Sequence, residues 1–168
     1  MANLFNAIPQ FGGGGGFAGY GLFVDQKTAG TPGGTFTSGA WRTRTINTEL
    51  YNNLTSASLS SNQITLGAGD YIITSRATAY KVNRHATRLY DVSNTAVLVS
   101  GSSEYAALND SHTSQSSLKF YLSLAVPTII SVQHLGQNTR ASDGFGINSS
   151  PTISVANEVY LILEIIEL

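Results

Sequence analysis

The densest group of side chains that could do chemistry lies between residues 76 and 143. It combines arginine, histidine, tyrosine and carboxylate groups in a chain with few charges, and its main members are Tyr80, Arg84, His85, Arg88, Glu104, Tyr105, Arg140 and Asp143. Because buried charges persist only when they are paired, we expect Arg84 or Arg88 to pair with a carboxylate of this group. Two interpretations follow: a structural ion-pair network at an end of the domain or between subunits, or a polar site for a sugar, with Tyr80 or Tyr105 as the stacking platform.

Motifs of known catalytic and cofactor sites are weak in this sequence. Gly14–Gly19 matches the G-x-G-x-x-G pattern, but neither flank reads as the strand or the helix that a bound pyrophosphate needs. His85, His112 and His134 lack the H-x-x-x-H and H-E-x-x-H spacings of zinc sites, and no G-x-S-x-G motif marks a serine nucleophile. The ten carboxylates offer no pair that resembles a glycosidase cleft. We therefore expect no enzymatic activity, no metal and no cofactor.

The charge and composition exclude further classes of function. Only 11% of the 168 residues are charged, and nine basic against ten acidic residues give a net charge of −1, with no basic patch for nucleic acid. No apolar stretch approaches the roughly 18–20 residues of a membrane span, and the first ten residues do not resemble a signal peptide. The chain has no cysteine, which excludes disulfides and thiolate sites. We expect neither nucleic acid nor a membrane as a partner.

Alternation of apolar and polar residues from Trp41 onward predicts antiparallel strands. The predicted strands are 41–47, 63–66, 71–80, 86–92, 96–100, 118–124, 128–134 and 158–166. The segment 49–58 is too rich in Asn and Thr for a helix. Roughly eight short strands separated by Gly, Asn, Asp and Ser turns predict an all-β, two-sheet antiparallel jelly-roll sandwich over residues 40–168.

The last predicted strand has apolar residues on both faces. Val159, Leu161 and Leu163 alternate with Tyr160 and Ile162. Such a strand is either central or covered on its outer face, by another subunit or by the chain's own N-terminal segment. We expect cover by another subunit, with the interface at Tyr121, Tyr160 and Ile162.

Residues 1–39 differ from the rest of the chain. Aromatic side chains are spaced through a glycine-rich tract, and glycine loses the most conformational entropy on ordering. This pattern predicts an extended N-terminal arm whose aromatic residues anchor it to a partner. The expected anchors are Phe5, Phe11, Phe17, Tyr20 and Phe23.

An ordered series of motifs resembles the tumour-necrosis-factor-like (TNF-like) jelly-roll domain of bacteriophage virion proteins and some bacterial surface proteins. The motifs are WRTRTINTE at 41–49, LGAGDY at 66–71, AYKVNRHATRL at 79–89, GSSEY at 101–105, QH at 133–134, RASDGFG at 140–146 and EVY at 158–160. The resemblance covers roughly residues 36–168 and does not extend to the arm; the family usually has Leu where this chain has Ile46. It implies a homotrimer with one sheet of each protomer packed around a three-fold axis. It also implies a non-enzymatic role, either as a tail-fibre tip or as a knob that decorates or cements the capsid.

From these observations we expect a virion structural protein. The arm and the lack of room for a fibrous shaft favour a trimeric capsid cement protein that clamps the major capsid protein, or another virion protein, through the arm. The first alternative is a receptor-binding tail-fibre tip or tail protein that recognises a host surface glycan. A second is an adhesive module on a bacterial surface or secreted from the cell.

Overall fold

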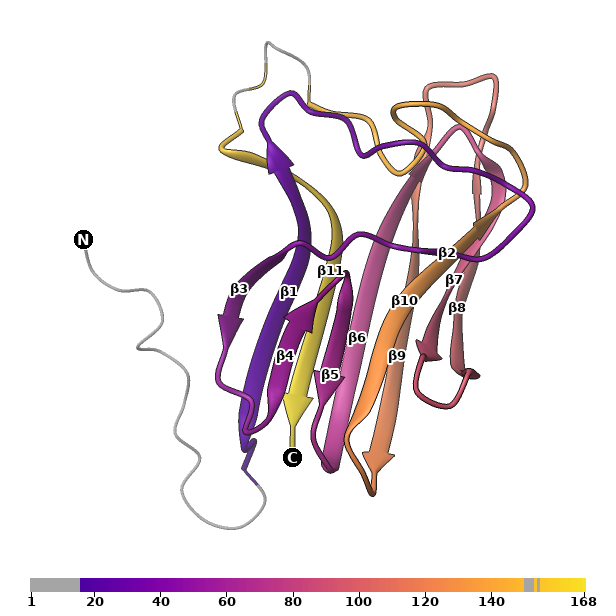
Figure 1. Ribbon diagram of the computed structural model, residues 1–168. Helices are drawn as coiled ribbons and strands as arrows, with labels where there is room; N and C mark the ends of the chain where they lie inside the picture. The colour runs from indigo at the N-terminus through magenta and orange to yellow at the C-terminus, as the bar shows by residue number, and fades with distance from the viewer. Residues whose placement is uncertain (1–15, 150–152, 154) are drawn as a thin grey trace.

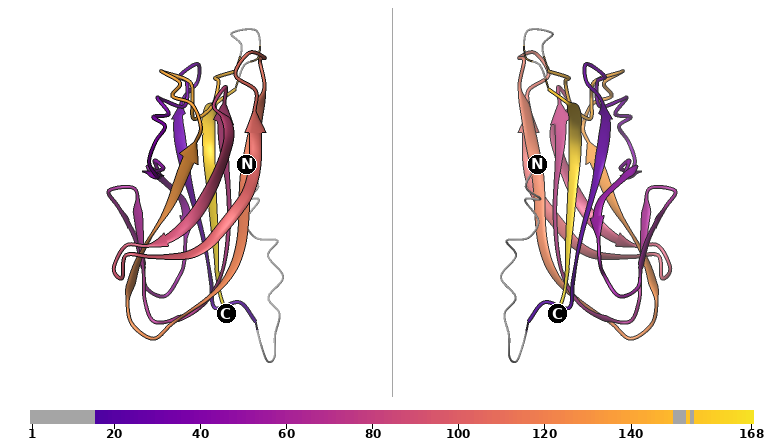
Figure 2. Two further views of the ribbon diagram at one scale, coloured as in Figure 1. Left: turned by 90° about the vertical axis from the view of Figure 1, so that its right-hand side faces the viewer. Right: turned by 90° about the vertical axis from the view of Figure 1, so that its left-hand side faces the viewer.

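In the computed structural model, which describes residues 16–149, 153 and 155–168, two antiparallel β-sheets pack face to face (Figures 1 and 2). The strands are β1 (Gly19–Thr28), β2 (Arg42–Thr43), β3 (Thr48–Asn52), β4 (Ala57–Ser60), β5 (Gln63–Leu66), β6 (Gly69–Tyr80), β7 (Asn83–Asp91), β8 (Ala96–Ala106), β9 (Thr113–Leu124), β10 (Thr128–Gly136) and β11 (Asn157–Glu167). The described part of the chain contains no helix. The all-β, two-sheet architecture predicted from the sequence is confirmed.

The five-stranded sheet has the order β3-β1-β11-β6-β9, and the six-stranded sheet has the order β4-β5-β10-β7-β8 with β2 added beside β10. At one side of the sandwich β8 of one sheet lies against β9 of the other. There the Ser116 hydroxyl donates to the Ser102 carbonyl at 2.7 Å, and the Ser117 amide donates to the Ser102 hydroxyl at 3.0 Å. These bonds satisfy backbone groups that an open sheet edge would leave unpaired.

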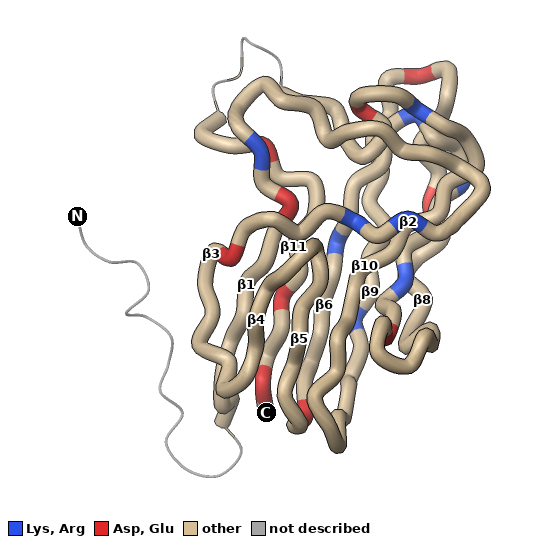
Figure 3. The backbone as a smooth tube through the Cα atoms, in the orientation of Figure 1, with Lys and Arg blue, Asp and Glu red and all other residues tan. Residues whose placement is uncertain are grey.

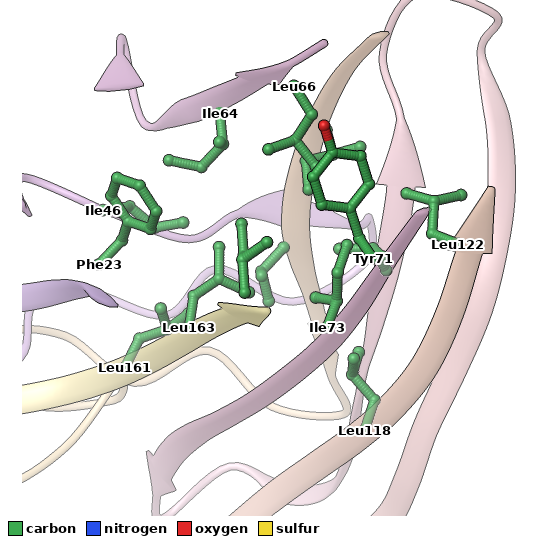
Figure 4. Close-up of a cluster of buried hydrophobic side chains, with 14 of the residues drawn as sticks. Phe23, Ile46, Ile64, Leu66, Tyr71, Ile73, Leu118, Leu122, Leu161 and Leu163 are labelled. Carbon is green, nitrogen blue, oxygen red and sulfur yellow. The ribbon is translucent and has the colours of Figure 1, made fainter. Parts of the chain in front are cut away.

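The core lies between the two sheets (Figure 4). Alternate residues of the long strands β6 and β11 are buried in it: Tyr71 and Ile73 from β6, Leu161 and Leu163 from β11. The buried Tyr71 hydroxyl donates to the Gly67 carbonyl at 3.1 Å, which satisfies the one polar group of that side chain. In these stretches of regular pairing the period-two pattern of the sequence reports which face of the strand is buried.

Strand β1 lies inside the segment that the sequence predicts to be an arm, and this corrects the expected domain boundary at residue 39. The strand pairs with β11 along its length and with β3 on its other side. Phe23 is completely buried in the core, and the half-buried Tyr20 hydroxyl donates to Glu164 at 3.2 Å. These two residues are therefore part of the sandwich and not of an N-terminal arm. Phe17 is 62% exposed, whereas Phe5 and Phe11 lie outside the described residues.

The glycines of β1 explain why the sequence reads as an arm. A Cβ at Gly19 would lie 2.9 Å from both the Asn53 carbonyl oxygen and Leu54 Cα, and a Cβ at Gly21 would lie 2.7 Å from a Leu54 methyl group. Both glycines are buried, because β1 approaches the 53–54 segment too closely for a side chain. Here glycine permits close packing, while in sequence it resembles a flexible tract.

A β-bulge corrects the expectation for Tyr160. The register of β1 with β11 skips this residue: Asp25 opposes Leu161, and the next residue of β1 opposes Val159. The extra residue reverses the alternation, so that Val159 is 41% exposed and Tyr160 only 4% exposed. The Tyr160 hydroxyl donates to the Thr31 carbonyl at 2.8 Å, so the chain itself buries this residue and it is not a subunit contact.

Candidate functional site

A cavity of about 1150 Å³ opens on the outer face of the six-stranded sheet, over β7, β8 and β10. Its lining combines aromatic, cationic and neutral polar side chains: Gly39, Trp41, Arg84, His85, Ala86, Ser103, Glu104, Tyr105, Leu135, Gly136 and Gln137. Four of the residues that the sequence places in a polar network or ligand site lie here, namely Arg84, His85, Glu104 and Tyr105.

Strand register decides which of these side chains face the cavity. Arg84 opposes Tyr105 across β7 and β8, and opposed residues share one face of a sheet. Both are exposed, and the Tyr105 side chain is 53% exposed. His85 and Glu104 oppose each other one position further along, so they belong to the other face, where His85 is buried. The outer face therefore carries the Arg84 guanidinium without the Glu104 carboxylate.

The segment before β2 forms one wall of the cavity. It holds Trp41, the single tryptophan of the chain, at the cavity edge. Arg42 Nε donates to the Thr37 carbonyl at 3.1 Å, and the Ser38 hydroxyl lies 3.0 Å from that of Thr139. These bonds fix the wall to the loop after β10, so the position of Trp41 is set by the fold.

Arg88 is held by stacking and not by the expected ion pair. Its guanidinium lies 4.3 Å from the centroid of the Trp41 ring and 4.8 Å from that of the Tyr90 ring, and Nε donates to Gln133 at 2.8 Å. Cation–π contact of this kind stabilises an arginine without neutralising its charge. The expectation that Arg84 or Arg88 pairs with a carboxylate is wrong for the described residues, whose ion pairs lie elsewhere.

The remaining predicted site residues form a separate cluster. Arg140 makes a two-point ion pair with Asp143, at 2.6 and 2.9 Å, and also lies over the ring of Tyr80. Tyr80 is only 5% exposed and does not line the cavity. It is therefore not the stacking platform that the sequence offered, and Tyr105 is the candidate that reaches the cavity.

A buried ion pair, which sequence reasoning missed, lies between the sheets. Arg44 is fully buried, and its guanidinium donates to the carbonyls of Thr78 and Tyr160, each at 2.9 Å. Its nearest carboxylate oxygen, on the buried Asp25, is 3.9 Å away. Burial raises the pKa of Asp25 against the opposing effect of Arg44, and burial lowers the pKa of Arg44 to about 10. Arg44 therefore keeps its charge at neutral pH.

From Arg44 a chain of hydrogen bonds leads through two histidines toward the surface. Arginine can only donate, so its contact of 3.3 Å with His134 Nδ1 makes that nitrogen an acceptor and places the proton on Nε2. Nε2 then donates to His85 Nδ1 at 2.9 Å, and His85 Nε2 donates to the Ser114 hydroxyl at 2.7 Å. This chain requires both histidines to be neutral. Burial lowers the pKa of His85 to about 4 and that of His134 well below its ordinary value, in agreement with the bonding pattern.

We expect the free energy of unfolding to fall as the pH drops from 6.5 to 4. In this interval the unfolded chain protonates His85 at its ordinary pKa, whereas the folded chain does so only near 4, so acid favours unfolding. The slope is about 1.4 kcal/mol per pH unit for His85 alone. Asp25 acts in the opposite direction, because its raised pKa lets the folded state take up a proton first. Urea denaturation at pH 7.5, 6.0 and 5.0 measures the slope, and His85→Gln should flatten it; an unchanged slope in that variant would refute the assignment.

A row of apolar side chains crosses the outer face of the five-stranded sheet. Register places Tyr20 opposite Ile166, Ile166 opposite Ile72, and Ile72 opposite Tyr121, across β1, β11, β6 and β9. Tyr121 is 57% exposed, and the other three are half-buried. Ile162, also expected at a subunit interface, is half-buried on the same face. This face therefore keeps two of the three residues predicted for self-association, without Tyr160.

Signals for the missed residues were present but ambiguous. Gln137 carries no local motif, and the motif that begins at Trp41 gave no indication of a binding site; only the fold brings these two residues beside Arg84. Arg44 lies two residues before the buried Ile46, so alternation would place both side chains on one face, but Arg42 has the same parity and is exposed. Within residues 16–149, 153 and 155–168, no group of three or more His, Asp or Glu side chains is arranged to hold a metal ion. That part of the chain also has no helix long and apolar enough to span a membrane.

Comparisons with known proteins identify the fold. No family model matches the sequence, and no curated protein sequence matches it. The crystal structure of murine APRIL at pH 5.0 superimposes with a TM-score of 0.58 and 10% identity, over 89% of this chain and 98% of that one. The globular domain of zebrafish complement 1qA protein gives a TM-score of 0.54 and 12% identity, over 87% and 95%. The chain has the TNF-like jelly-roll fold, as its sequence predicted; identities this low show the fold alone.

Proposed function

We propose that this chain is a structural protein of a bacteriophage virion, a homotrimer that decorates or cements the capsid. The observation that carries the proposal is the apolar row Tyr20–Ile166–Ile72–Tyr121 on the outer face of the five-stranded sheet. In a chain so rich in Ser, Thr, Asn and Gly, an outward apolar row across four strands favours contact with another subunit. The TNF-like fold and the motifs that resemble phage virion domains support the same assignment.

Attachment to the virion is assigned to the residues before β1. Because Gly19 begins the sandwich, the glycine- and aromatic-rich residues 1–18, with Phe5, Phe11 and Phe17, supply the contacts to a shell protein. Many weak contacts repeated over a lattice offset the entropy lost when such a segment is ordered. Tyr20 and Phe23 have no part in this attachment.

We expect Ile72→Glu to dissociate the trimer. The substitution places a charge in the middle of the apolar row, where desolvation of a carboxylate without a partner is unfavourable. Multi-angle light scattering should change from three times the chain mass of 17.8 kDa to a single chain. The matched control is Ile129→Glu, a half-buried isoleucine of the other sheet, which should leave the mass unchanged. A wild-type chain that is monomeric at all concentrations would refute the trimer.

Cryo-electron microscopy of the particle that carries the protein tests its location. We expect three-fold knobs on the shell, and deletion of residues 2–15 should release the protein while circular dichroism and trimer mass stay unchanged. Absence from every particle, or full retention after the deletion, would contradict the proposal.

The second candidate is a receptor-binding tail protein, and the cavity lined by Trp41, Arg84 and Tyr105 favours it. Density confined to the tail would move the assignment to this candidate.

A further inference from the structure

We propose that the cavity on the outer face of the six-stranded sheet binds an acidic saccharide, with Trp41 and Tyr105 contacting the sugar rings and Arg84 binding the acidic group. The site does not depend on the virion assignment. It lies on the sheet opposite the apolar row, so it remains open whether the chain is a trimer or a monomer.

Charge on this face favours an anion. Arg84 and Arg88 both lie on the outer face of β7, and Figure 3 shows how sparse charges are along the chain. The acidic residues of β7, β8 and β10 are Asp91 and Glu104; Glu104 lines the cavity, but register assigns both side chains to the opposite face. Among the described residues, none makes an ion pair or hydrogen bond to the Arg84 guanidinium. An exposed guanidinium beside a cavity, with no carboxylate on its own face, is suited to a carboxylate or sulfate of a ligand.

The aromatic residues favour a sugar over a simple anion. Trp41 lies at one wall of the cavity, and its ring is stacked with Arg88, which restricts its orientation. Tyr105 presents more than half of its side chain to solvent beside Arg84. Aromatic rings bury the apolar C–H faces of sugar rings, while their polar edges remain free to bond hydroxyl groups.

The neutral polar residues complete this chemistry. The Ser103 hydroxyl and the exposed Gln137 amide lie at the cavity and can donate to, or accept from, sugar hydroxyls. A volume of about 1150 Å³ has room for more than one sugar ring. A purely apolar ligand would leave Arg84 and these polar groups without partners, so it does not fit the lining.

The test uses the full chain on an array of sialylated, uronic-acid-containing and sulfated oligosaccharides, each beside its neutral counterpart. We expect binding to acidic members only, and the carboxylate and sulfate arms identify the acidic group. The tightest member is then titrated in solution, where Trp41 fluorescence reports from the cavity itself because the chain has no other tryptophan.

We expect Arg84→Gln to weaken binding tenfold or more, and Tyr105→Ser to weaken it as well; both residues are exposed, so the fold should persist. The matched control is Arg140→Gln, which removes an arginine outside the cavity and should leave affinity unchanged. The monomeric Ile72→Glu variant should titrate as the wild type does, which separates this site from the trimer proposal. No binding on the array, equal binding to neutral counterparts, or full affinity in Arg84→Gln would overturn the inference.

Discussion

Replacement of Arg44 by methionine is expected to lower the free energy of unfolding by about 3–5 kcal/mol, which is the usual cost of removing one partner from a buried ion pair. The variant leaves the buried Asp25 carboxylate with Lys27 as its one remaining cation, at 3.6 Å, and it removes the guanidinium donors from the carbonyls of Thr78 and Tyr160. His134 also loses the donor that sets its tautomer. Urea denaturation at pH 7.5 measures the loss.

Two further variants make the Arg44 experiment decisive. Arg42→Met removes an exposed arginine two residues away and should cost less than about 1 kcal/mol. The double variant Asp25→Asn with Arg44→Met should recover part of the loss, because no buried charge then remains unpaired. If Arg44→Met were as stable as Arg42→Met, the buried pair would have no structural role.

Phe23→Ala is expected to destabilise the protein by about 3–5 kcal/mol, whereas Phe17→Ala should change stability by less than about 0.5 kcal/mol. Phe23 is completely buried between the sheets, so its truncation leaves a cavity; Phe17, six residues earlier, is 62% exposed. Thermal or urea unfolding of the two variants gives the comparison directly.

The same pair of variants separates two roles of aromatic residues in this segment. When retention of the protein on the particle is measured, Phe17→Ala should weaken attachment without changing the free energy of unfolding. Phe23→Ala should weaken attachment only to the extent that it unfolds the protein. Equal stability of the two variants would contradict the burial of Phe23 in the sandwich and would support an arm that extends to residue 39, as the sequence predicts.

The two ends of the sandwich interior are held together by different interactions. Around Tyr71 and Leu163 the core is aliphatic and aromatic, whereas around Arg44 and His134 it depends on directional hydrogen bonds. Bonds of this kind require correct protonation states, so the polar end should respond first to acid. This end includes His85, which also borders the cavity, so saccharide affinity and stability can be measured together across the same pH range.

The alternation of apolar and polar residues was by itself enough to predict the sandwich. Burial alternates residue by residue along β9, and it does so in β6 from Asp70 to Ala79, after which Tyr80 is a second consecutive buried residue. The same alternation predicted Tyr121 and Ile162 on an outer face, because a strand's two faces are a local property of its sequence.

Only the tertiary structure decided the role of residues whose environment depends on distant segments. Gly19 and Gly21 resemble a flexible tract in the sequence, but in the structure they allow β1 to pack closely against residues 53–54. Tyr160 faces inward because a bulge shifts the register of β11 with β1. Likewise Trp41, Arg84 and Tyr105 come together only through the pairing of β7 with β8 and the wall before β2. The physical reason is that strand faces follow from neighbouring residues, whereas register, close approach and burial of charge follow from contacts between segments far apart in sequence.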